Sequence, residues 1–168
     1  MENLNWNQFI KKIYIKTSIE DLYKYWATQE GIEKWFLKSA NYTSKDGTKR
    51  SSDDPVRQGD EYVWEWHNFE YLGKGEIIEA NGTNHLAFTF EGSTVSIDLS
   101  SGRDMTLIAL TQSNIREDEE SKMKIYNGCS NGWTFFLANL KAIAEHNISL
   151  VDTKPDLNMG DGLEWVNV

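Results

Sequence analysis

A stripe of apolar side chains near the C-terminal end constrains the fold more than any other feature of the chain. The segments before this stripe are mostly short and strand-like. A sheet and a single long amphipathic helix can bury both apolar faces only by packing against each other. Apolar residues at the spacing i, i+3, i+4, i+7 form one stripe along one face of a helix. The residues with this spacing are Trp133, Phe136, Leu137, Leu140, Ile143 and Ala144. The pattern predicts an α+β domain in which an antiparallel sheet wraps around this helix.

The expected strands are rich in β-branched and aromatic residues and are separated by turn signals. Asn81-Gly82 favours positive φ and is the strongest hairpin signal in the chain, and residues 101–104 form a second turn. Six or seven strands are predicted, over residues 9–16, 38–43, 59–66, 71–79, 85–90, 94–100 and 105–113.

Two short helices are expected directly after the first strand. Ser18 precedes an apolar segment that begins with acidic residues, an arrangement that satisfies the free amides and the positive end of the helix dipole. Thr28 can cap a second short helix that reaches Trp35 and Phe36.

Two segments lack a regular apolar pattern. Residues 44–58 contain Gly47, Pro55 and several serines and aspartates, and are predicted to form a long exposed loop. Residues 1–148 are expected to form the domain and residues 149–168 a C-terminal tail. The apolar tip around Trp165 has two interpretations, a frayed end or a segment that docks on a sheet edge or over a cavity.

Length, charge and cysteine content limit the domain number, the compartment and the partners that the chain can have. The length of 168 residues predicts a single domain, and the one cysteine excludes an internal disulfide. The net charge of the chain is −9. The acidic balance argues against nucleic acid and anionic membrane surfaces. No apolar leader or run of about 20 apolar residues is present, so we expect a cytoplasmic protein without an integral membrane segment. The acidic residues 117–120 are either a solvated face or a surface for a basic partner.

Aromatic side chains are the strongest candidates for a binding site. Tyr62, Trp64 and Trp66 alternate with the mostly polar residues Val63, Glu65 and His67, so period two places three large rings on one face of a strand. Phe88 and Phe90 follow the same pattern on a later strand. Such rings either fill a core or line a pocket, and the sequence leaves both open.

The sequence offers little support for catalysis. Cys129 has no histidine nearby in sequence, so an inert thiol is expected. Glu65 and His67 share one strand face, with Glu70 close by, and would form an acid/base pair in a pocket only if that face pointed inward. The aromatic rings on the opposite face of this strand are buried more favourably than a carboxylate, so we expect that face to point inward instead. The histidines lack metal-ligand spacing and no phosphate-binding loop is present. We therefore expect no metal, no cofactor and no catalytic residue.

The order of several modest landmarks resembles a known superfamily. The landmarks are Trp26, Glu33-Lys34-Trp35-Phe36, Gly59-Asp60, Leu110-Thr111-Gln112-Ser113, and Asn131-Gly132-Trp133 with Leu140. In this order, from Phe9 to His146, the chain resembles the START-like (SRPBCC) helix-grip domains, and within them the heat-shock protein 90 ATPase activator-like proteins.

The resemblance implies a curved sheet that grips the C-terminal helix, with a cavity between them. Three functions follow as hypotheses: a cytoplasmic module that binds a hydrophobic or aromatic small molecule (lipid-like or polyketide-like), a co-chaperone-like domain that contacts a chaperone, and an enzyme of hydrolase or cyclase type. Fold alone does not choose among them. The residues predicted to line the cavity are Trp26, Trp35, Tyr62, Trp64, Trp66, Phe88, Phe90, Trp133, Phe136 and Leu140.

Overall fold

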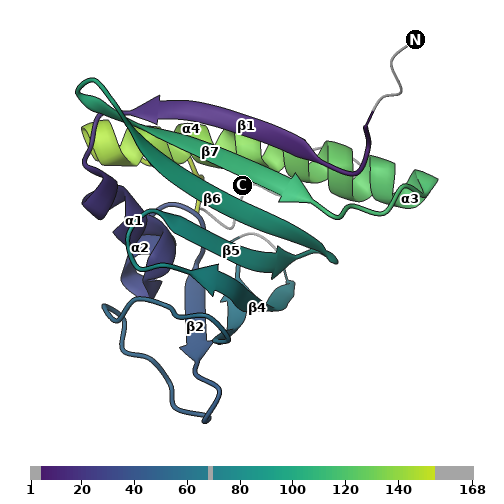
Figure 1. Cartoon of the computed structure of the whole chain (residues 1–168), viewed down its shortest axis with the longest axis horizontal. Helices are drawn as coiled ribbons and strands as arrows, with labels where there is room; N and C mark the ends of the chain where they lie inside the picture. The colour runs from purple at the N-terminus through teal and green to yellow at the C-terminus, as the bar shows by residue number, and fades with distance from the viewer. Residues whose placement is uncertain (1–4, 68–69, 154–168) are drawn as a thin grey trace.

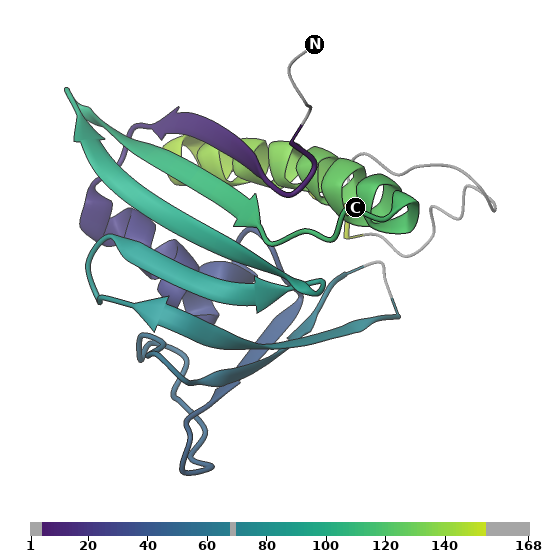
Figure 2. The ribbon, with the colours of Figure 1, turned by 45° about the vertical axis from the view of Figure 1, so that its right-hand side comes forward.

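Seven antiparallel strands form one curved sheet in the computed structural model, which describes residues 5–67 and 70–153 (Figures 1 and 2). The order across the sheet is β1-β7-β6-β5-β4-β3-β2. The strands are β1 (Phe9–Ile15), β2 (Ser39–Thr43), β3 (Glu61–Glu65), β4 (Leu72–Ala80), β5 (His85–Phe90), β6 (Ser93–Gly102) and β7 (Met105–Ser113). Each of the seven predicted strands is present, with ends shifted by a few residues at most.

The two short helices begin at the predicted caps, but the second ends at Glu33 and does not reach Trp35 and Phe36 as expected. Helix α1 spans Ile19–Ala27 and α2 spans Gln29–Glu33. The Ser18 hydroxyl accepts a hydrogen bond from the Asp21 amide at 3.0 Å, and Thr28 Oγ1 accepts one from the Gly31 amide at 2.9 Å. Both predicted caps are therefore confirmed.

The C-terminal helix begins earlier than its apolar stripe. A short helix α3 (Glu119–Ser121) leads into a π-helix η1 (Lys122–Cys129), which continues directly into α4 (Ser130–His146). Cys129 directly precedes α4 and is the last residue of the π-helix, so helical backbone already extends through it before the apolar stripe begins at Trp133. The π-helix has a wider turn than an α-helix, so its side chains do not follow the 3.6-residue period by which the helix was recognised.

Helix α4 lies behind strands β1 and β7 in Figure 1 and packs on the concave face of the sheet. Burial alternates along β7, where Thr106, Ile108, Leu110 and Gln112 face inward. On α4 the stripe residues Trp133, Leu137 and Leu140 are buried, while Phe136, Ile143 and Ala144 are partly buried against the same core. This arrangement is the predicted helix-grip fold.

The loop of residues 44–58 is largely exposed, as predicted, but it is anchored at both ends. Val56 is only 2% exposed, and its amide donates a hydrogen bond to the Ala27 carbonyl oxygen at 2.7 Å. The Arg50 guanidinium is buried beside Asp60, where their side chains are 9% and 3% exposed. The interpretation of this whole segment as a solvated loop is therefore wrong at Arg50, because its charge is paired inside the protein.

The predicted tail lies mostly outside the described residues, including Trp165. Its first part is tied to the domain, because the Leu150 amide donates a hydrogen bond to Oδ1 of the buried Asn139 at 2.7 Å. The boundary at residue 148 stays a prediction. No helix in the described ranges combines the length and apolar content needed to cross a membrane.

Candidate functional site

Six of the ten residues predicted to line a cavity lie in the packed core. They are at most 3% exposed: Trp26, Trp35, Tyr62, Trp64, Phe88 and Leu140. Tyr62 and Trp64 stack at 3.9 Å between ring centroids, and Trp64 packs edge-on against Phe88 at 5.2 Å. These side chains fill the space between sheet and helix and support the residues nearer the surface.

The other four predicted residues meet around an open cavity, although one of them, Trp133, is itself only 2% exposed. Trp66 and Phe90 approach it from the sheet side, and Trp133 and Phe136 from α4. The cavity has a volume of about 320 Å³, and its lining also includes Phe36, Glu91, Lys124, Ile125, Gly128, Cys129 and Gly132. A second hollow of about 360 Å³ shares Trp66, Glu91 and Phe136 with the first and adds Tyr71. The two form one continuous aromatic site, which we call the aromatic cavity.

Ring contacts fix the walls of the aromatic cavity. Phe36 lies at its centre, stacked on Trp133 at 5.0 Å and edge-on to Trp66 at 5.7 Å and Phe136 at 4.8 Å. Phe36 comes from the turn after α2, so three separate parts of the chain hold one cluster. Offset and edge-on pairs of this kind are favourable beyond the apolar area they bury.

Two glycines on β4 make room for the ring of Tyr62 on β3 and for that of Trp66, which follows this strand. A Cβ atom on Gly73 would lie 2.8 Å from the Trp66 ring, and one on Gly75 would lie 2.5 Å from the Tyr62 hydroxyl oxygen. The hydroxyl group of Tyr62 in turn donates a hydrogen bond to the Thr89 carbonyl oxygen. The Gly73-Lys74-Gly75 sequence is thus a steric requirement of the aromatic cluster.

The π-helix and the first turns of α4 form the opposite wall of the aromatic cavity. Gly128 and Gly132 line this wall, and a Cβ atom on Gly132 would meet no atom within 4 Å. The space is open because these positions carry no side chain. Segments of π-helix occur frequently at functional sites, where they reshape a helix surface.

A buried chain of hydrogen bonds supports the inner end of the aromatic cavity. The Trp133 indole N–H donates to Gln112 Oε1 at 2.8 Å, and Gln112 Nε2 donates to the Ser93 hydroxyl at 2.8 Å. Ser93 Oγ donates to the Phe90 carbonyl oxygen at 2.6 Å. Gln112 is fully buried, so this chain fixes the position of Trp133 against the sheet.

Cys129 is poorly suited to act as a nucleophile. Burial raises the pKa of its thiol to about 11, and a hydrogen bond with Gln112 opposes this shift only in part. At neutral pH the thiol is therefore protonated, and the thiolate is the reactive form.

We expect Cys129 to react with iodoacetamide at pH 8 about 100-fold more slowly than an exposed cysteine. The reason is that its thiol pKa of about 11 lies some two units above the ordinary value. Mass spectrometry of the alkylated protein over time measures this rate, and unfolding in urea should restore the ordinary rate. Fast alkylation of the folded protein would contradict the burial of this thiol.

Glu65 and His67 do not face the aromatic cavity. Glu65 forms an ion pair with Lys38 at 2.6 Å, and the hydrogen bond from Lys38 lowers the pKa of the carboxyl group. His67 is exposed. The hypothesis of an inward-facing acid/base pair therefore finds no support in this geometry.

Sequence reasoning missed several residues of the cavity, most notably Tyr71 and Glu91. Glu91 and Gly92 form the two-residue connection between β5 and β6, with φ values of 50° and 72°. Positive φ at both positions is what a tight hairpin of this kind requires. The Glu91-Gly92 pair after Phe90 is a sequence pattern from which a turn can be predicted. Nothing in the sequence, however, indicates that Glu91 lies beside Trp66.

Solved structures share this fold at low sequence identity. SSP2350 from Staphylococcus saprophyticus superposes with a TM-score of 0.67 and 17% identity, over 84% of this chain and 94% of that one. The Aha1 dimer from Colwellia psychrerythraea gives 0.65 and 18%, over 83% and 96%. DynU16, from the dynemicin biosynthetic locus, gives 0.66 and 13%, over 85% of this chain and 49% of that one.

No curated protein matches the chain in sequence. The sequence profile of one family does, over residues 16–145, which include the two short helices, every strand except β1, and nearly all of α4. The profile is described as activator of Hsp90 ATPase homolog 1-like protein. The match covers most of the chain and agrees with the helix-grip fold, so this protein belongs to the family of activator of Hsp90 ATPase homolog 1-like proteins.

Proposed function

We propose that this protein is a cytoplasmic binding module that holds a hydrophobic or aromatic small molecule in the aromatic cavity. The observation that carries the proposal is the cluster of half-buried rings around an open space. Trp66, Phe90 and Phe136 are each partly buried on the cavity wall, whereas the rings behind them are fully packed. Binding pockets for small molecules are commonly apolar and aromatic with few polar groups.

The size of the cavity limits the ligand. A volume of about 320 Å³, with an adjoining hollow of about 360 Å³, suits a molecule with one or two rings or a short acyl chain. Burial of apolar surface contributes about 25 cal/mol per Å² to the free energy of binding, before the entropy lost on ordering the ligand and side chains is subtracted.

A variant that fills the cavity tests this proposal. In Gly132→Leu the new side chain points into open space, and leucine is a better helix former than glycine. We expect the melting temperature to stay the same or rise, while binding of a lipid and polyketide panel is lost. Ala138→Leu is the matched control, because Ala138 is exposed on the same helix.

Native mass spectrometry of the freshly purified protein provides the ligand class. A defined extra mass that disappears on denaturation, and that is absent from Gly132→Leu, is the expected result. Intensity-based titration of tryptophan fluorescence then gives affinities, because Trp66 and Trp133 line the cavity. If Gly132→Leu and Ala138→Leu bind the panel equally, the aromatic cavity is not the binding site.

The family supports a second candidate function, contact with a chaperone. Its profile is named after an activator of the Hsp90 ATPase. The exposed residues Glu117–Glu120 at the start of α3 supply negative charge for a basic surface. If this protein stimulates a chaperone ATPase and the stimulation weakens with added salt, this candidate is supported. If Gly132→Leu stimulates the ATPase as strongly as the wild type does, the contact with the chaperone does not depend on a ligand in the aromatic cavity.

A further inference from the structure

In the part of the chain that the structure describes, one carboxylate lies among the rings at the outer part of the aromatic cavity. The outer hollow is lined by Trp66, Tyr71, Phe136 and Glu91, which are three aromatic side chains and one acid. Trp66 and Tyr71 stack with ring centroids 6.0 Å apart. Within residues 5–67 and 70–153, no lysine or arginine belongs to this lining.

The backbone holds Glu91 at this position. It occupies the first place in the two-residue β5–β6 connection, and its φ of 50° is a conformation that glutamate rarely adopts. Both residues line the outer hollow, and burial and the neighbouring Glu91 carboxylate raise the pKa of Tyr71. Tyr71 and Glu91 are thus direct neighbours at the cavity mouth.

The nearest basic group on the inner cavity does not neutralise Glu91. Lys124 lines the inner part, but its ammonium group pairs with Glu120 at 2.8 Å and its side chain is 70% exposed. The whole chain carries a net charge of −9, which further favours a positive ligand at the mouth.

We propose that the outer part of the aromatic cavity recognises the charged head of a small organic cation, an ammonium group attached to an apolar or aromatic body. The faces of aromatic rings carry partial negative charge and attract ammonium groups, most strongly in tryptophan. Glu91 adds a full negative charge, and the inner cavity takes the apolar body. This inference rests on the proposed function and specifies the chemical class of the ligand.

The test compares a cation with its neutral isostere. Benzyltrimethylammonium and neopentylbenzene have nearly the same shape and differ by one positive charge. We expect the wild-type protein to bind the cation at least tenfold more tightly, as followed by tryptophan fluorescence and by NMR shifts of the indole groups. The preference should weaken as salt is added.

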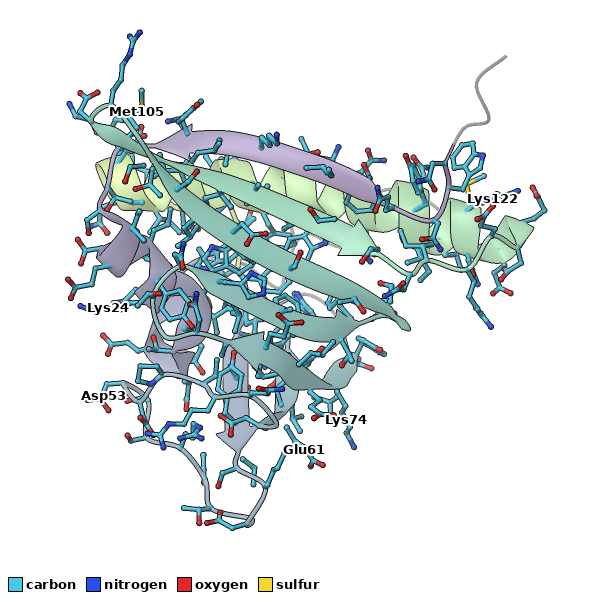
Figure 3. All side chains as sticks on the ribbon, in the orientation of Figure 1. Lys24, Asp53, Glu61, Lys74, Met105 and Lys122 are labelled. Atoms are coloured by element: carbon cyan, nitrogen blue, oxygen red, sulfur yellow. The ribbon has the colours of Figure 1, made fainter. Side chains whose placement is uncertain are left out.

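Two substitutions at one position separate charge from shape. Glu91→Gln is expected to weaken binding of the cation about tenfold and to leave the neutral compound unchanged. Glu91→Asp keeps the charge, tolerates positive φ and should retain the preference. Glu61→Gln is the control, because Glu61 is an exposed acid on β3, labelled in Figure 3, and is absent from the cavity lining.

The outcomes distinguish this inference from the proposed function. Equal affinity for cation and isostere, both lost in Gly132→Leu, would overturn the inference and leave the binding module in place. Equal weakening by Glu91→Gln and Glu61→Gln would also overturn it, since only general charge would then matter. Failure of both compounds and of the whole panel to bind would count against the proposed function itself.

Discussion

Replacement of Arg50 by methionine is expected to lower the free energy of unfolding by about 3 to 5 kcal/mol, because it leaves a buried carboxylate without its partner. Arg50 donates hydrogen bonds to Asp60 through Nε and Nη2, and to Asp54 through Nη1 at 2.9 Å. Asp60 is only 2% exposed. Urea unfolding followed by tryptophan fluorescence measures the effect.

A matched control lies in the same loop. Arg57 also pairs with Asp54, at 3.5 Å, but its side chain is 70% exposed. Arg57→Met should therefore change the free energy of unfolding by no more than about 0.5 kcal/mol. Equal effects at Arg50 and Arg57 would show that the loop does not depend on the buried pair.

A double substitution identifies the cause. Asp60→Asn removes the negative charge but keeps an oxygen that can accept the hydrogen bond from the Arg57 amide, which is 2.8 Å long in the wild type. We expect Arg50→Met combined with Asp60→Asn to be more stable than Arg50→Met alone by at least about 1 kcal/mol. No recovery would indicate that lost packing of the arginine stem, not the unpaired charge, destabilises the protein.

Local signals allowed the fold to be predicted. The period of the α4 stripe, the caps at Ser18 and Thr28, and the Asn81-Gly82 turn each act within a few residues, so the sequence alone contains their cause. The order of these elements was then specific enough to indicate the helix-grip fold. The π-helix was missed because its side chains follow a different period.

The aromatic cavity could be predicted only in part. Period two correctly placed Tyr62 and Trp64 inside, but it could not show which rings would be buried and which would border open space. That distinction depends on Gly128 and Gly132, which leave room on the facing helix. Glu91 and Tyr71 lie beside Trp66 only because of strand pairing, so their positions do not follow from sequence spacing. The pairing of Arg50 with Asp60 likewise depends on how the loop packs.

The last prediction concerns the buried bond chain behind the cavity, where Gln112→Met is expected to lower the free energy of unfolding by about 2 to 3 kcal/mol. Methionine has a similar shape but neither accepts from the Trp133 indole nor donates to Ser93, as Gln112 does at 2.8 Å in each case. A buried donor left without a partner costs about 1 to 3 kcal/mol. Urea unfolding checks this value.

A double-mutant cycle separates this hydrogen bond from general repacking. Phenylalanine at position 133 has no N–H group to satisfy, so Gln112→Met should be less harmful in the Trp133→Phe background, with a coupling of at least about 1 kcal/mol. Thr111→Val, next to Gln112 on β7 but on the opposite face, should change stability by no more than about 0.5 kcal/mol. Because the same bond orients Trp133 on the cavity wall, Gln112→Met should also weaken ligand binding. If stability falls while affinity and indole NMR shifts stay unchanged, the ring contacts of Trp133 with Trp26, Phe36 and Phe90 are enough to hold it in place.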